Sequence, residues 1–384
     1  MRSWTYVIPL MLALTGCADD DVGGNETGDS PDPTGGGECT EMIDIGPADE
    51  SACAPAASDY QPQANAEGDP WPACAPDDGS YPLIADTPSS IARVEAFEEV
   101  MTLLAGTPDS TAFTEARAAY SVDEGLESRV VRREDLHYPE IPEADWDPGV
   151  DPDKQCSVEA NVTKYPERCA GPARIGPIVT EAFAAGQTGE GVPEIHTARI
   201  EAALLWFLHL SVYKEANTCL LTEKDCDSSW AYYTGGFDRN GGIGLAEEIR
   251  RLTEMGHNRI WDGFAAARCW RELYPIEDYP TYDDVPAEGQ MLLDNAYAQL
   301  DTALWYGWSR VIRERIERQG GLCGVESEAN IAFLKIAGPV LSEQAERMDP
   351  AAAAPLADLW AADAPTADQL QAAVDTIDAM FGCP

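Results

Sequence analysis

The sequence has little positive charge and very few histidines. It has 25 Lys and Arg residues against 68 Asp and Glu residues, a formal net charge of −43, and only 4 His residues. This balance repels nucleic acid and anionic lipid headgroups, and it attracts cations. We therefore expect no nucleic-acid partner, and the field attracts cations such as a metal ion without indicating a specific site.

The sequence also lacks long apolar runs beyond its amino terminus. A bilayer-spanning helix needs roughly 18 uninterrupted apolar residues. The most apolar later segment, Ala202 to Leu208, is bounded by Glu201 and His209. We expect a protein that is anchored to a membrane rather than one that spans it.

Sequence signatures of common enzymes are missing. There is no Gly-x-Ser-x-Gly, no His-Glu-x-x-His and no phosphate-binding glycine loop. The glycine-rich residues 233–237 and 240–244 are typical of turns. The sequence therefore favours a protein that is not an enzyme, and no catalytic residue is predicted.

The amino terminus resembles a bacterial lipoprotein signal. Arg2 and the apolar run from Val7 to Leu14 have the pattern of a secretory signal, and Leu14-Thr-Gly-Cys17 resembles the lipobox. We expect residues 1–16 to be removed and Cys17 to carry a lipid. The predicted location is the bacterial cell envelope, on the periplasmic or surface face of the outer membrane. An ordinary secreted protein is the alternative.

The remaining cysteines predict disulfides. None has the Cys-x-x-Cys spacing of a zinc site, and an even number remains in an exported chain once Cys17 is set aside. Cys156 with Cys169 and Cys219 with Cys226 are candidate local pairs, and the connectivity stays open. The ten cysteines are at positions 39, 53, 74, 156, 169, 219, 226, 269, 323 and 383.

Composition divides the chain into a tether and a domain. Residues 17–80 are rich in Asp, Gly and Pro and predict a flexible tether. Its three cysteines leave open that part of it is stapled to the domain. Residues 81–384 predict an all-α helical bundle domain, as one bundle or two bundle-like halves, with long disulfide-stapled loops. Helices are expected over residues 91–104, 110–120, 123–136, 174–185, 193–219, 241–260, 288–318, 327–346 and 366–381.

Three pairs of residues are candidate metal ligands. Glu254 and His257 have the i, i+3 spacing of the Glu-x-x-His motif of di-iron bundles, although the motif occurs once rather than twice. Glu201 and His209 lie about 80° apart around one helix and about 12 Å apart along it, so they share a groove without binding one ion directly. Asp294 and Asp301, seven residues apart, lie on a mostly apolar stripe, where a carboxylate needs a partner.

Each pair also has a purely structural interpretation. His209, amid apolar residues, is typical of a hydrogen-bonded core histidine, and His257 is compatible with a polar face or a helix end. Glu254 lies within reach of Arg250 and Arg251. Asp294 near a helix start is favoured by the helix dipole without any ligand.

Three segments carry a resemblance to a known family. They are Phe207-Leu-His-Leu-Ser-Val-Tyr-Lys-Glu-Ala, Ser229-Trp-Ala-Tyr-Tyr-Thr-Gly-Gly and Gly244-Leu-Ala-Glu-Glu-Ile. Over roughly residues 175–320 the chain resembles the Fe-assimilating proteins, which are secreted or periplasmic. The resemblance implies an all-helical extracytoplasmic protein that binds iron or assists its uptake.

A more distant likeness is to the imelysin-like iron-regulated lipoproteins. Their Gly-x-His-x-x-Glu motif is not matched at Glu194-Ile-His-Thr-Ala-Arg199. The sequence therefore predicts a lipid-anchored iron-binding protein that assists iron acquisition, with the three pairs above as ligands suited to iron. A structural or interaction lipoprotein without a metal site, with a protein partner still to be identified, is the alternative.

Overall fold

The computed structural model describes residues 39–43, 45–51, 53–61, 71, 80–84, 87–122, 125–130, 175–220 and 222–384. All of them belong to one compact unit, Gly36–Pro384. Within these ranges the regular elements are helices, and the one β-bridge is the isolated pair Cys39 and Cys323. The predicted all-α fold class is confirmed. Cys17 lies outside the described residues.

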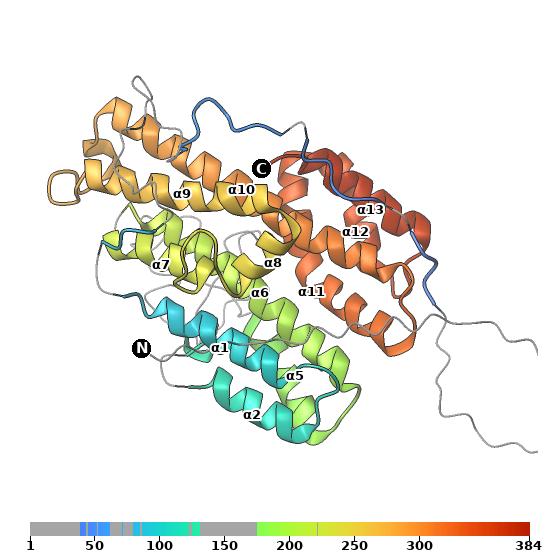
Figure 1. Ribbon diagram of the computed structural model, residues 1–384. Coiled ribbons are helices and arrows are strands. Elements are labelled where there is room, and N and C mark those ends of the chain that lie inside the picture. The colour runs from blue at the N-terminus through green and yellow to red at the C-terminus, as the bar shows by residue number, and fades with distance from the viewer. Residues whose placement is uncertain are drawn as a thin grey trace, which may run out of the picture. The chain divides into compact units, whose positions relative to one another are not determined.

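Figure 1 shows the helices of the described residues. In chain order they are α1 (Ser90–Leu103), α2 (Ser110–Tyr120), α3 (Glu127–Val130), α5 (Ile175–Thr188), α6 (Pro193–Thr218), α7 (Glu223–Thr234), α8 (Leu245–Leu252), α9 (Glu254–Leu273), the 3-10 turn η4 (Tyr282–Asp284), α10 (Ala287–Gln319), α11 (Gly324–Met348), α12 (Pro350–Ala361) and α13 (Ala367–Met380).

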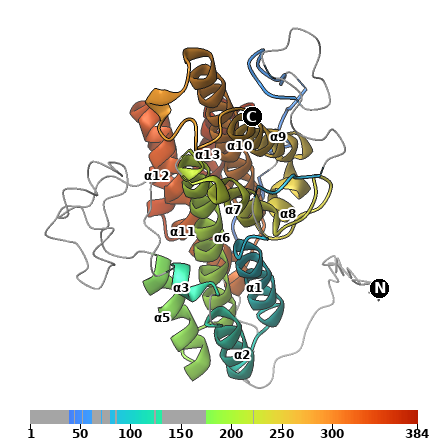
Figure 2. The same cartoon turned by 90° about the vertical axis from the view of Figure 1, so that its left-hand side faces the viewer.

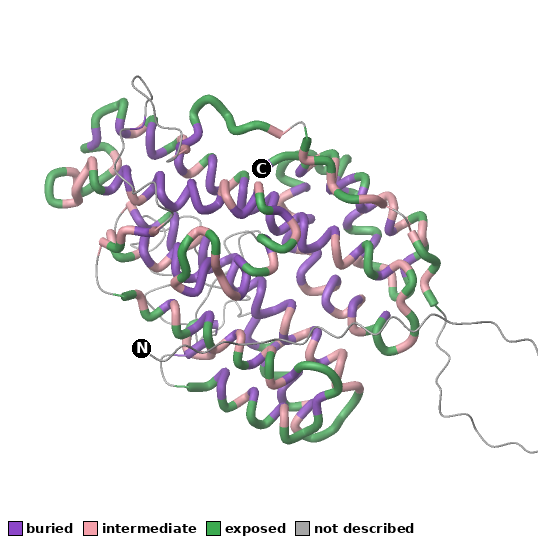
Figure 3. Tube along the Cα trace, in the orientation of Figure 1, coloured by how far each residue is buried: buried purple, intermediate pink, exposed green. Residues whose placement is uncertain are grey.

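Helix α6 is the centre of the fold. It begins with Pro193, whose fixed φ suits the first turn of a helix, and it is buried without interruption from Ala202 to Val212. Helices α5, α7 and α11 pack around it, and α9 packs along α10. Figure 2 shows α6 running between these neighbours, and Figure 3 shows that its middle and that of α10 are buried.

The structure corrects the predicted helix over residues 241–260. The chain forms two helices there, because Thr253 has extended backbone angles and caps α9 by accepting a hydrogen bond from Gly256 N at 2.9 Å. Glu254 is therefore the first residue of α9. Helices α7 and α12 were not predicted, and of the predicted helix 123–136 the structure describes only α3 and the residues just before it.

The described residues of 39–61, here called the strap, run antiparallel to α10. Disulfides join Cys39 to Cys323 and Cys53 to Cys383. Between these bonds, Arg313 donates to the backbone oxygens of residues 45 and 46, and Tyr306 donates to Glu50 at 2.6 Å. At the far end of the strap, the side chain of Gln299 forms two hydrogen bonds with the backbone of Tyr60.

The strap was predicted to lie in the flexible tether. Its composition is poor in apolar residues, but covalent bonds and side chains of α10 supply the contacts that composition alone would not. Cys219 and Cys226 form the local disulfide that their spacing suggested, and Cys269 is also disulfide-bonded. Cys156 and Cys169 lie outside the described residues. No described helix is long and apolar enough to cross a membrane.

Candidate functional site

The first predicted ligand pair lies on α6 in two different environments. Glu201 forms an ion pair with Arg315 of α10. His209, two turns further along, is fully buried against Trp305 and Trp308, with ring centroids 5.0 Å away in both cases. Burial lowers the pKa of His209 to about 3, so the ring is neutral at physiological pH. Glu201 is thus a partner in an ion pair, and His209 packs in the aromatic core.

In the second pair, both ring nitrogens of His257 form hydrogen bonds. Nε2 lies 2.7 Å from the backbone oxygen of Arg239, and Nδ1 lies 3.0 Å from the hydroxyl of Tyr233. Because a carbonyl only accepts, Nε2 carries the proton and Tyr233 donates to Nδ1. Burial lowers the pKa of His257, which favours this neutral form. Glu254, one turn earlier, is exposed.

The third pair lies on α10, with one residue on the protein surface and the other at a cavity. Asp294 is exposed and accepts a hydrogen bond from the Tyr282 hydroxyl at 2.9 Å. Asp301 is half-buried and faces a cavity. In the part of the chain that the structure describes, no three His, Cys, Asp or Glu side chains come together as a metal site. The assignment of these six residues as ligands stays a prediction.

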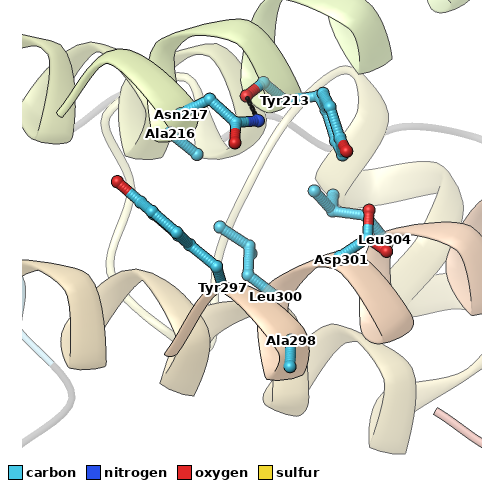
Figure 4. Close-up of a pocket in the computed structure, with 8 residues that line it drawn as sticks. All are labelled: Tyr213, Ala216, Asn217, Tyr297, Ala298, Leu300, Asp301 and Leu304. Carbon is cyan, nitrogen blue, oxygen red and sulfur yellow. Dashed lines mark hydrogen bonds between the residues drawn. The ribbon is translucent and has the colours of Figure 1, made fainter. Parts of the chain in front are cut away.

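The cavity beside Asp301 lies between α6 and α10 and has a volume of about 250 Å³ (Figure 4). We call it the α6–α10 pocket. Asn217 and Ala298 are exposed at its rim, so it opens to solvent there. Its lining residues are Tyr213, Ala216, Asn217, Tyr297, Ala298, Leu300, Asp301 and Leu304.

The carboxyl group of Asp301 is only partly satisfied by hydrogen bonds. Its Oδ1 is buried and has no hydrogen-bond partner among the described residues. Burial raises the pKa of Asp301, while hydrogen bonds from Tyr213 and Trp305 and the charge of Arg347 lower it in part. An unmade hydrogen bond at a buried acceptor costs about 1–3 kcal/mol.

The other polar groups of the pocket surround an apolar floor. Asn217 donates through Nδ2 to the backbone oxygen of Tyr213 at 2.8 Å, which leaves its own Oδ1 as an acceptor. Tyr213 directs its hydroxyl toward Asp301, whereas Tyr297 directs its hydroxyl to the opposite end (Figure 4). Burial raises the pKa of both tyrosines, so both are neutral phenols.

Of the six predicted ligands, only Asp301 lines this pocket, and three of its polar residues were missed. The signal was present, since Tyr213 with Asn217 and Tyr297 with Asp301 are i, i+4 pairs that share a helix face. The sequence does not show that the two faces meet. Their apposition follows from the packing of α6 and α10.

A second cavity of about 470 Å³ lies under the strap, and we call it the strap pocket. It is lined by Glu50, Cys53, Pro55, Asp59, Gln61, Glu254, Met255, Asn258, Arg259, Asp262 and Gln299. Asp59 is ion-paired with Arg259, and Asp262 is ion-paired with Arg239. Glu254 thus lines a different cavity from Asp301.

No protein-family model, curated protein or solved structure matches this chain. The resemblance to the Fe-assimilating proteins therefore stays a prediction.

Proposed function

We propose that the chain is a lipid-anchored, extracytoplasmic binding protein without catalytic activity, and that a small ligand occupies its α6–α10 pocket. The observation that carries this proposal is the buried Oδ1 of Asp301, which has no donor among the described residues and lies beside a cavity of about 250 Å³. A bound donor would satisfy this oxygen and recover the cost of burying it.

The cellular setting is proposed from other features. The lipobox-like Leu14-Thr-Gly-Cys17 supports anchoring of the chain in a bacterial envelope. The disulfides of the strap and of Cys219 with Cys226 agree with an oxidising compartment outside the cytoplasm.

Blocking the mouth of the pocket tests the binding proposal. Ala298→Trp places a large ring at the exposed rim, and Ala357→Trp makes the same change on an exposed face of α12. Ligands found by a melting-temperature screen of small molecules should stabilise the native protein and the α12 variant but not Ala298→Trp. Equal stabilisation of all three proteins would place binding elsewhere and refute this site.

Iron binding is the second candidate function, in line with the family resemblance. The observation that favours it here is the phenol of Tyr213 next to the carboxyl group of Asp301, because hard oxygen ligands suit ferric iron. The protein would then assist iron acquisition at the cell envelope.

Elemental analysis of protein purified from iron-replete cells tests this candidate. Bound iron that is lost in Asp301→Asn would support it, and loss in Glu254→Ala with His257→Ala would locate the iron at that pair instead. Protein that is free of metal, with a melting temperature that iron does not change, would refute it. Zinc in place of iron would also refute it.

A further inference from the structure

We propose that the ligand of the α6–α10 pocket is a small organic ammonium ion whose N–H groups donate to Asp301 Oδ1. This inference rests on the proposed function, since it names the ligand class for the same pocket. It begins from the two polar atoms there that are buried and without a hydrogen-bond partner among the described residues, Asp301 Oδ1 and the Tyr297 hydroxyl, of which only the first belongs to an acidic group.

The hydrogen-bonding groups of the pocket favour a ligand that donates. Asp301 contributes carboxylate oxygens, and Asn217 has a side-chain oxygen that is not used in its bond to the Tyr213 backbone. The donors of the pocket are the second N–H of Asn217 and the two tyrosine hydroxyls, of which that of Tyr213 already bonds to Asp301. A ligand with several N–H groups therefore matches this set better than an anion or an acceptor-rich molecule does.

The charges in and around the pocket also favour a cationic ligand. Asp301 is the one acidic or basic residue that lines the pocket, and Arg347 of α11 is the cation whose field acts on it. Arg347 is exposed, so solvent and salt screen its charge. The net charge of −43 attracts cations to the whole surface. An organic cation thus meets both a favourable field and a half-buried carboxylate whose Oδ1 is buried.

The apolar floor and the volume limit the size of the ligand. Ala216, Leu300 and Leu304 supply contacts for carbon rather than for a hydrated metal ion. A water molecule occupies about 30 Å³, so the pocket holds about eight heavy atoms. A chain of four to six carbons with one or two amino groups fits this size.

Calorimetric titration with matched probes tests the ligand class. The full-length protein is titrated with n-butylammonium, with tetramethylammonium, which has the same charge but no N–H group, and with neutral n-butanol. We expect n-butylammonium to bind at least about tenfold more tightly than either of the others, as a charge-assisted hydrogen bond requires. Equal binding of the two cations would mean that the surface charge alone attracts them.

Two isosteric substitutions in α10 test whether the ammonium ion bonds to Asp301. Asp301→Asn removes the carboxylate from the pocket, and Asp294→Asn makes the same change at an exposed position seven residues earlier. Binding of n-butylammonium should weaken by roughly 10- to 100-fold in the first and stay within about twofold in the second. Equal loss in both, or in neither, overturns the proposal, and circular dichroism establishes that both variants fold.

The same titrations separate this inference from the proposed function. If amines fail while a neutral ligand or iron stabilises the protein and Ala298→Trp abolishes that effect, the ligand class is wrong and the pocket remains the site. If no small molecule or metal distinguishes native protein from Ala298→Trp, both proposals fall.

Discussion

The two pockets differ in how their carboxylates are satisfied. The strap pocket is larger and contains four acidic residues, but Asp59 and Asp262 are paired with arginines and Glu50 accepts a hydrogen bond from Tyr306. The α6–α10 pocket has one acidic residue, whose Oδ1 lacks a partner among the described residues. The number of acidic residues in a pocket and the number of their oxygens that lack a hydrogen bond are therefore separate properties in this chain.

The largest expected effect on the free energy of unfolding comes from loosening the strap, which forms one wall of the strap pocket. Cys53→Ser with Cys383→Ser releases the middle of the strap from the carboxyl terminus. We expect the free energy of unfolding to fall by about 4 kcal/mol, because the bond closes a long loop of the unfolded chain. Denaturant unfolding measures this change.

The α6–α10 pocket should be unaffected by that double substitution, since no strap residue lines it. Hydrogen exchange should accelerate in residues 45–61 and stay unchanged in α6 and the middle of α10. Faster exchange around Asp301 would show that the two pockets are coupled.

A somewhat smaller effect tests whether the carboxylates of the strap pocket are satisfied by ion pairs. Arg259→Gln leaves Asp59, whose side chain is 6% exposed, without its cation. Breaking such a buried pair should cost about 3 kcal/mol in the free energy of unfolding. Lys335→Gln is the control, because its partner Asp363 is 97% exposed and no measurable change is expected. Similar effects of both substitutions would contradict the distinction.

Acid should weaken the interface of α6 and α10 through His209. Its pKa is about 3 when folded and about 6.5 when unfolded, so only the unfolded chain gains a proton between these values. The stabilisation is complete above pH 6.5 and is lost as the pH falls toward 3, by about 1.4 kcal/mol per pH unit. At pH 5 the loss is about 2 kcal/mol.

Urea unfolding at pH 7, 6 and 5 measures that slope. His209→Phe keeps an aromatic ring against Trp305 and Trp308 and removes the titrating group. The variant should show a shallower decline of stability with acid than the native protein. Parallel declines would mean that His209 does not contribute.

The smallest effect concerns Asp301 in the ligand-free protein. Burial raises its pKa, so the folded chain holds the proton more tightly than the unfolded chain and stability falls as the pH rises through this range. Asp301→Asn should therefore raise the free energy of unfolding by about 1 kcal/mol at pH 8 and leave it unchanged at pH 4. A stabilisation of equal size in Asp294→Asn would attribute the gain to net charge instead.

Helices with a long apolar pattern were predictable from the sequence. The spacing of apolar residues located α1, α2, α6, α10, α11 and α13, because a helical face that is buried must repeat every three to four residues. Helix α7 was missed because its residues are buried on most sides and include polar Asp227 and Ser229, so it has no clear apolar stripe. The break at Thr253 was missed because one capping side chain decides it.

The candidate site was only partly predictable for a related reason. Asp301 was identified as a carboxylate on an apolar stripe, and it lies in the α6–α10 pocket. Glu254 and His257 were paired by spacing, yet the structure commits the ring of His257 to Tyr233 and Arg239 while Glu254 is exposed. Spacing along one helix places two side chains near each other but does not state what other partners surround each of them.

The sequence by itself determined that the protein is helical, that α6 is its centre and that disulfides are to be expected, because each of these follows from periodicity or composition along the chain. Tertiary structure alone decided that Cys53 pairs with Cys383, that the strap lies along α10 and that Asp301 is left with an unpaired oxygen beside a cavity. These features depend on which surfaces meet in three dimensions. Those contacts form between residues that are far apart in the chain, so a local sequence pattern does not predict them.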